Sequence, residues 1–208
     1  MRIPANSALL VTDVQNDFCP GGSLAVKDGD QVVPVINRIM RYFTRIVATQ
    51  DWHPLGHMSF ARNHPGKKVY DVAEINGMKQ VLWPAHCVQG TAGADFHPAL
   101  NTESFSLIVR KGMNPMIDSY STFVENDKKT VTGLEGYLKV LHIEHLYLTG
   151  LATDYCVFYS ALDAVDLGFQ TYVILDACRG VDVPDGNVAK SVSAMKERGI
   201  IMTSFSEL

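Results

Sequence analysis

Six short apolar runs, rich in β-branched residues, recur along this chain and are separated by helical patterns or by one long loop. The runs cover residues 8–12, 45–49, 106–110, 145–150, 170–175 and 200–203. Such nearly continuous hydrophobicity is typical of parallel strands that are covered on both faces. The alternation predicts an α/β protein, a three-layer α/β/α doubly wound fold with a six-stranded, mainly parallel sheet. With the strands numbered along the chain, we expect the order 3-2-1-4-5-6.

The stretches between the strands carry apolar residues at helical spacing. Helices are predicted around residues 32–40, 134–141, 157–165 and 188–195. Gly168 and Gly199 are well placed to end the last two. Residues 53–105 break the alternation because they are rich in Gly, Pro, His and Asn, and we expect a long functional loop there.

Composition narrows the class of protein. The 208 residues are 47% hydrophobic and 19% charged, which suits one domain spanning 1–208. The net charge of −4 argues against nucleic-acid binding. No apolar run approaches the roughly 18 residues that cross a bilayer, and no signal peptide is visible, so we expect a cytoplasmic protein. The four cysteines are far apart without a CxxC pair, so free thiols are expected rather than disulfides or a zinc finger.

Polar residues follow the predicted strands at the edge where open α/β sheets bind ligands. Asp13, Asp51 and Lys111 follow the first three strands, and Cys156 opens the helix after the fourth. In the expected strand order the first and fourth strands are neighbours, which brings Asp13 and Cys156 together. Asp13 can then accept the thiol proton while Lys111 holds its charge.

The sulfur of Cys156 is expected in the first turn of its helix, with Thr153, Asp154 and Tyr155 as candidates for the N-cap. The partial positive charge at this helix end favours a thiolate and predicts a lowered pKa for Cys156. Because a helix end supplies only about 0.3–1 kcal/mol, a neighbouring cation such as Lys111 is also required. Taken alone, Cys156 would be a buried small hydrophobic residue, as most single cysteines are.

A metal site is indicated at the end of the second strand. Asp51 and His53 are two residues apart, so their side chains point to the same side of an extended chain. His86 from the long loop would complete three protein ligands, which leaves open positions as in catalytic sites. Spacing alone leaves His57, His64 and Cys87 as competitors for the third position. Mixed nitrogen and oxygen ligands suit Zn²⁺, with Fe²⁺ or Mn²⁺ as alternatives.

Several blocks together carry a resemblance to a known family. They are V-T-D-V-Q-N-D-F-C-P-G-G-S-L at 11–24, D-W-H-P at 51–54, W-P-A-H-C-V-Q-G-T at 83–91, K-G at 111–112 and G-L-A-T-D-Y-C-V at 150–157. With these blocks the chain closely resembles the nicotinamidases of the isochorismatase-like cysteine hydrolase superfamily, over nearly its whole length. Ala85 stands where many bacterial members carry Asp, and Tyr155 where some carry His.

The resemblance implies a role for each matching residue. It implies a catalytic triad of Asp13, Lys111 and Cys156, and a metal held by Asp51, His53 and His86, with His57 sometimes a fourth ligand. It also implies a cis peptide between Leu151 and Ala152, which would aim the amides of Ala152 and Cys156 at an oxyanion. The pocket positions that it implies are Phe18, Leu24, Trp83, Tyr120 and Tyr155, of which Phe18, Trp83 and Tyr120 are also aromatic-wall candidates from composition.

The function that we expect from this resemblance is hydrolysis of nicotinamide to nicotinate and ammonia through a cysteine thioester, in NAD salvage. Pyrazinamide is an expected second substrate. The alternatives are a related amidohydrolase of ureido or carbamoyl substrates, an isochorismatase, whose chemistry does not use the cysteine, and a non-enzymatic, metal-stabilised binding domain. The expected partner is the small substrate, with no nucleic acid and no membrane, and a homodimer is the oligomer that base rates favour.

Overall fold

A six-stranded parallel sheet forms the centre of the structure, a computed structural model that describes residues 3–208. Its strands are β1 (Ser7–Thr12), β2 (Ile46–Asp51), β5 (Leu107–Lys111), β6 (His145–Leu151), β7 (Gln170–Arg179) and β8 (Ile201–Thr203). They pair in the order β5-β2-β1-β6-β7-β8, and every pair is parallel. The predicted fold class is confirmed, and the six predicted strands lie in the predicted order; only the labels differ, because β3 and β4 stand outside this sheet.

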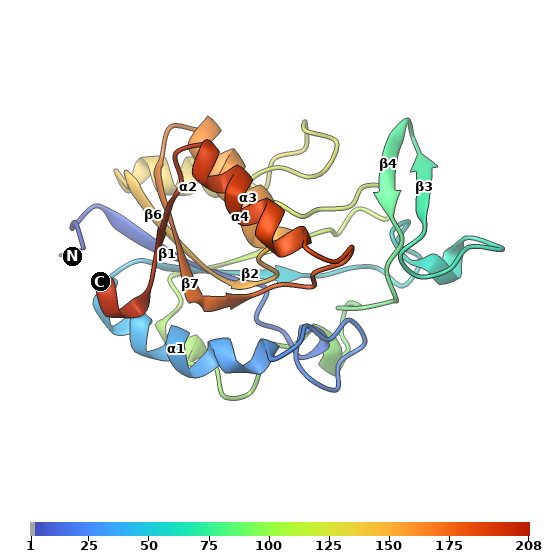
Figure 1. The fold of residues 1–208 in the computed structure, drawn as a ribbon, viewed down its shortest axis with the longest axis horizontal. Coiled ribbons are helices and arrows are strands. Elements are labelled where there is room, and N and C mark those ends of the chain that lie inside the picture. Colours follow the sequence, from blue (N-terminus) through green and yellow to red (C-terminus); the bar gives the residue numbers. More distant parts are fainter. Residues whose placement is uncertain (1–2) are drawn as a thin grey trace.

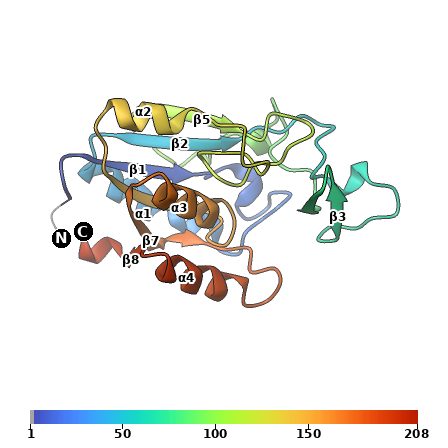
Figure 2. The ribbon, with the colours of Figure 1, turned by 90° about the horizontal axis from the view of Figure 1, so that it is seen from above.

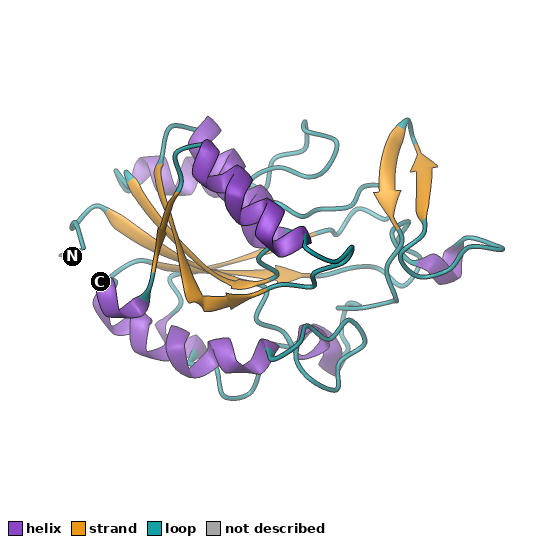
Figure 3. Ribbon diagram, viewed as in Figure 1, coloured by secondary structure: helices purple, strands orange, loops and turns teal. Residues whose placement is uncertain are grey.

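Helices cover both faces of the sheet. In Figures 1 and 3, α1 (Val32–Ile39) lies on one side, and α2 (Leu134–Val140), α3 (Cys156–Asp166) and α4 (Asn187–Glu197) lie on the other. Alternate residues of β1 pack into two hydrophobic cores, one on each face of the sheet. Leu9 and Val11 pack with α1, whereas Ala8 and Leu10 pack with α2 and α3. This burial on both faces explains the continuous apolar run at the centre of β1. The helices within residues 3–208 are too short or too polar to cross a bilayer.

β7 is longer than the predicted run 170–175, because it continues beside β6 after a register shift between Leu148 and Gly150. Asp176 interrupts the apolar pattern, which hid this extension from the sequence. Gly150 has a φ of +106°, and a Cβ at this position would lie 2.0 Å from the carbonyl oxygen of Thr12 on β1. Only glycine allows this approach of β6 to β1 without strain.

Residues 53–105 are more ordered than a single long loop. They contain an antiparallel hairpin of β3 (Val72–Ile75) and β4 (Met78–Val81), which projects beyond the carboxyl ends of the sheet strands (Figure 2). The expectation of one long loop is therefore wrong for residues 72–81. Its turn is Asn76-Gly77, with φ of +53° and +77°, a pair of residues that favours two-residue hairpins. Short 3₁₀ helices also occur: η1 (Asn16–Phe18), η2 (Gly29–Gln31), η3 (Met40–Tyr42), η4 (Ala61–Asn63), η5 (Ala92–Ala94), η6 (Thr102–Ser104) and η7 (Phe205–Glu207).

Candidate active site

A buried ammonium lies where the carboxyl ends of β1, β2 and β5 meet. Lys111, the last residue of β5, is 1% exposed, and its Nζ lies 2.9 Å from Asp13 Oδ2. The same nitrogen donates to Asp51 Oδ1, to the carbonyl of Ser119 at 2.9 Å and toward Cys156 Sγ at 3.5 Å. Burial lowers the pKa of Lys111, but the carboxylates of Asp13 and Asp51 outweigh it and hold this pKa well above its usual value. Lys111 is therefore a permanent cation that two carboxylates share.

Asp13 is held in one orientation by the neighbouring strand. Its backbone has a φ of +48°, its amide donates to Thr49 Oγ1 at 3.1 Å, and Thr49 Oγ1 donates back to Asp13 Oδ1 at 2.6 Å. The remaining oxygen faces Lys111. Burial raises the pKa of Asp13 although Lys111 opposes it, so this carboxyl takes up a proton more readily than an exposed aspartate does.

Cys156 is the first residue of α3 and lies beside these charges. Its sulfur and one carboxylate oxygen from each of Asp13 and Asp51 lie within 4.8 Å of one another. Burial raises the pKa of Cys156 well above its ordinary value, Lys111 lowers it, and the two carboxylates add to the increase. With Asp13 and Asp51 both charged, the pKa of Cys156 is raised, so the predicted lowering of this pKa is wrong. The thiol must therefore pass its proton to a neighbour before it can attack, and Asp13 is the base within reach.

Of the three N-cap candidates of α3, Tyr155 occupies the N-cap position, without a side-chain hydrogen bond to the helix. The carboxylate of Asp154 instead accepts hydrogen bonds from the loop after β7, and the amide of Thr153 donates to the carbonyl of Arg179. The first turn of α3 is fixed by tertiary contacts, which the local sequence could not reveal.

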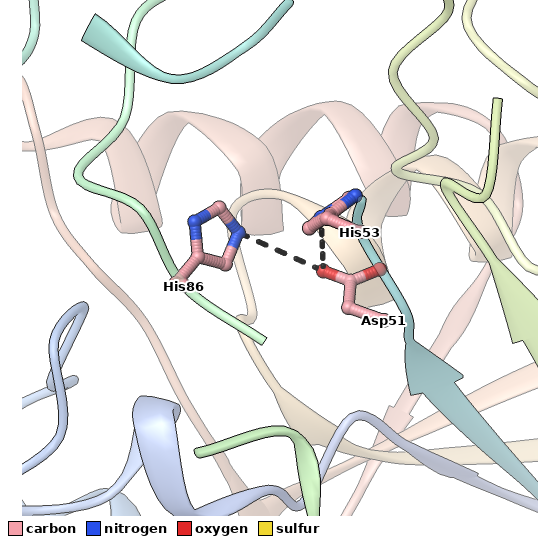
Figure 4. Close-up of side chains that lie close together, drawn as sticks. All are labelled: Asp51, His53 and His86. Atoms are coloured by element: carbon pink, nitrogen blue, oxygen red, sulfur yellow. Dashed lines mark ion pairs between the residues drawn. The ribbon is translucent and has the colours of Figure 1, made fainter. Parts of the chain in front are cut away.

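Asp51, His53 and His86 bring their donor atoms together at the end of β2 (Figure 4). The Nε2 atoms of His53 and His86 lie 3.5 and 3.9 Å from Asp51 Oδ2. The Nδ1 atoms lie 2.8 Å from the carbonyls of Gly112 and Pro84, so each Nδ1 carries a proton and Nε2 is the ring nitrogen that each histidine can offer to a metal.

The pKa shifts of two of these three residues favour their metal-binding forms. Burial and His53 lower the pKa of His86 to about 4, so His86 is neutral near pH 7. Burial raises the pKa of Asp51, but Lys111 and His53 more than offset this and the net pKa is low, so a carboxylate is present. One carboxylate oxygen and two imidazole nitrogens form a donor set that fits a divalent metal ion.

The three other candidates for the third ligand position, His57, His64 and Cys87, contact other groups. His57 contacts Ser59 Oγ at 2.7 Å through Nδ1 and the carbonyl of Ile117 at 3.1 Å through Nε2. It belongs to a second, adjacent group with His53 and Asp118, whose donor atoms lie within 4.8 Å of one another. The remaining two, His64 and Cys87, point toward the carbonyls of Met58 at 2.6 Å and of Gly93 at 4.0 Å.

A mostly apolar pocket opens onto the sulfur and the candidate metal ligands. Its lining includes all five pocket residues expected from the resemblance, Phe18, Leu24, Trp83, Tyr120 and Tyr155, together with Asp51, His86, Ala152 and Cys156. The ring of Trp83 meets that of Tyr155 edge-on at 4.8 Å, and its Nε1 donates to the hydroxyl of Tyr120 at 3.1 Å. The pocket can therefore hold a flat ring close to the thiol. The Leu151–Ala152 peptide beside it is cis, as the resemblance implied.

Sequence reasoning missed residues that shape this pocket. Asp118 lines it, and its carboxylate accepts from Gln80 Nε2 at 2.7 Å, which ties the pocket to the hairpin. Val181 lines it from the loop after β7. Gln15 accepts from the amide of Asp51 and donates to its carbonyl, both at 2.8 Å, and so fixes that ligand's backbone. Of these three residues, only Gln15 could have been identified from the sequence, because it lies in the block at 11–24 that matches the family.

The fold and this site define a class: the chain belongs to the isochorismatase family, whose domain model matches residues 7–207. Several of its relatives within that family are nicotinamidases. The chain is 49% identical to the nicotinamidase of Acinetobacter baylyi over 200 residues, 96% of this chain and 93% of that protein. The structure of the Acinetobacter baumanii nicotinamidase/pyrazinamidase is 50% identical, covers 98% of both chains and gives a TM-score of 0.96. The pyrazinamidase of Pyrococcus horikoshii, solved in complex with zinc, is 35% identical over 96% of this chain and 99% of that chain, with a TM-score of 0.78.

Proposed function

We infer that this chain is a nicotinamidase, which converts nicotinamide and water to nicotinate and ammonia. The observation that carries the inference is the position of the Cys156 sulfur. It lies 3.5 Å from Lys111 Nζ and lines the same aromatic pocket as Asp51 and His86. The chemistry would return nicotinamide to pyridine nucleotide synthesis.

The first half-reaction needs one proton transfer in each direction. Asp13 accepts the thiol proton while Cys156 Sγ attacks the carboxamide carbon, and the carbonyl becomes an oxyanion. The backbone amides of Ala152 and Cys156 are the donors that we assign to this oxyanion. Asp13 then gives its proton to the nitrogen, the carbon–nitrogen bond breaks, and ammonia leaves a thioester on Cys156.

The second half-reaction uses the same groups with water as nucleophile. Asp13 accepts a proton from water as the oxygen attacks the thioester carbon. The carbon–sulfur bond then breaks, Asp13 returns this proton to the sulfur of Cys156, and the acid leaves as nicotinate after losing its remaining proton to solvent. Lys111 remains charged throughout, because its pKa is held far above neutrality by Asp13 and Asp51. Its role is to stabilise the negative charge that moves among Asp13, Asp51 and the sulfur.

We assign the divalent ion of this site to Asp51, His53 and His86, with zinc as the preferred metal. When bound, the ion would supply a Lewis-acidic centre that orients the ring nitrogen of the substrate. The orientations of His53 and His86 support this assignment, since each Nδ1 is bonded to a backbone carbonyl and both Nε2 atoms face Asp51. The aromatic wall of Trp83 and Tyr155 would hold the ring at the angle that brings its carboxamide to the sulfur.

Ammonia release from nicotinamide by the wild type and by Cys156→Ala tests this function. We expect the variant to lose activity by at least about 10³-fold, since the nucleophile is removed while the pocket is kept. Pyrazinamide should be hydrolysed by the same enzyme with the same dependence on Cys156. Equal rates for the two proteins would exclude the thioester route, and faster release from a ureido or carbamoyl substrate would favour the related amidohydrolases.

A further inference from the structure

Asp154 lies just before α3 and is hydrogen-bonded to the loop between β7 and α4. Its side chain is buried, with 2% exposure. One carboxylate oxygen accepts from the amide of Val181 at 2.9 Å. The other accepts from the amide of Asp182 at 2.9 Å and from Asn187 Nδ2 at 3.0 Å. A single carboxylate therefore fixes three donors on a segment about thirty residues away in sequence.

The same loop forms part of the pocket. Val181 lines the pocket beside Tyr155 and Cys156, the two residues that follow Asp154. The hydroxyl of Tyr155 donates to the carbonyl of Val183 at 2.8 Å, which adds a second link between α3 and the loop. The nucleophile and this wall are thus joined through two neighbouring side chains.

Gly180 permits the close approach of the loop to Asp154. A Cβ at this position would lie 2.2 Å from Val188 Cγ2 and 3.0 Å from Asp154 Oδ1. The loop is therefore packed against the carboxylate without room for one further methyl group. A wall held this tightly leaves little tolerance for extra atoms on a bound ring.

We propose that Asp154 is a positioning residue that sets the width of the pocket at Val181 and so selects unsubstituted ring amides over ring-substituted ones. The proposal rests on the proposed function, because the selectivity concerns the substrate of that reaction. Asp154 does not touch the substrate; it acts through the position of Val181 relative to Cys156. Loss of its hydrogen bonds should widen the pocket while the triad stays in place.

The test compares wild type with Asp154→Asn and Asn187→Ala, using nicotinamide and nicotinamides that carry one methyl group at each ring carbon in turn. Asp154→Asn removes the charge and one acceptor at nearly constant shape, and Asn187→Ala removes one of the three donors. We expect Asp154→Asn to raise KM for nicotinamide by about tenfold, equal to about 1.4 kcal/mol, with kcat changed by less than about threefold. For at least one methylated substrate, we expect the preference for nicotinamide to fall by a similar factor. Asn187→Ala should shift both quantities in the same direction by a smaller amount.

Asp166→Asn is the matched control, because Asp166 is on the same helix and its carboxylate pairs with Arg198 on the surface. This variant should keep the wild-type KM and selectivity. Hydrogen exchange at the amides of Val181 and Asp182 should be faster in Asp154→Asn and unchanged in Asp166→Asn. Asn187→Ala provides the same comparison if Asp154→Asn does not fold.

Different results overturn different claims. Suppose that Asp154→Asn or Asn187→Ala is folded, active and faster in amide exchange, yet keeps the wild-type KM and selectivity. That result would overturn the positioning role of Asp154 and leave the proposed function standing. A fall in kcat with constant KM would overturn the positioning role too, because that result indicates damage to the triad rather than a wider pocket. If the wild type releases no ammonia from nicotinamide, the proposed function fails and this inference falls with it.

Discussion

Replacing Lys111 with methionine removes a buried ammonium that lies between two carboxylates. The methionine side chain is similar in length, so the core loses the charge and three hydrogen bonds rather than much volume. In the wild type, Asp13 and Asp51 have Lys111 Nζ as their shared cation, and both are almost completely buried. The variant would leave two like charges buried side by side.

Loss of one partner from a buried ion pair costs about 3–5 kcal/mol, because the remaining charge is left without compensation. For a chain of this size, that lowers the melting temperature by roughly 6–20 °C. The loss should depend on pH. Without the ammonium, burial and mutual repulsion raise the folded-state pKa of Asp13 and Asp51 above the unfolded value of about 3.9. The folded variant then holds protons that the unfolded chain releases, so its stability falls as pH rises from about 4 through those raised pKa values.

Urea unfolding of metal-free protein at several pH values from 5 to 8 measures this loss. Lys128→Met is the matched control, since the Lys128 side chain is 56% exposed and pairs with Asp163 at 3.1 Å on the surface. The control should change the unfolding free energy by less than about 0.5 kcal/mol. A loss below about 1 kcal/mol for Lys111→Met at pH 7, or a loss that does not shrink toward pH 5, would refute the shared-cation account.

Other predictions follow from the glycines and the metal ligands. In Gly112→Ala, the new Cβ would lie 2.3 Å from Cε1 of His53, so zinc affinity, measured by competition with a chelator, should fall by about 10–100-fold. Gly168 also has a positive φ but has open space around it, so Gly168→Ala should keep the wild-type zinc affinity. Gly150→Ala should lower the unfolding free energy by more than about 2 kcal/mol, because its Cβ would lie 2.0 Å from the carbonyl oxygen of Thr12; an unchanged urea midpoint would contradict this. Dialysis against a chelator should abolish ammonia release, and zinc should restore it better than magnesium; full activity without any metal would contradict the ligand assignment.

Most of the fold could be predicted from the sequence because the central strands β1, β2 and β6 are buried on both faces. Leu9 and Leu10 are both fully buried, one in each core, so the run of apolar residues carried the signal. The hairpin was missed because its strands are short and partly exposed, with Val72 at 55% exposure, although its Asn76-Gly77 turn was visible.

The site was only partly predictable, and the reason is distance along the chain. Asp13, Lys111 and Cys156 each end or follow a strand of the sheet, so strand order was enough to bring them together. Asp118 and Val181 enter the pocket from irregular loops, where no periodic pattern marks them. The pKa of Cys156 could not be foreseen either, because it depends on complete burial beside two carboxylates as well as on the helix end.

Rapid acid quench of the enzyme during turnover, followed by mass spectrometry of its peptides, tests the nucleophile most directly. We predict one nicotinoyl group on the peptide that contains Cys156, formed as ammonia is released and absent from Cys156→Ala. Ammonia release by Cys156→Ala at the wild-type rate, or the acyl group on a different residue, would contradict the account.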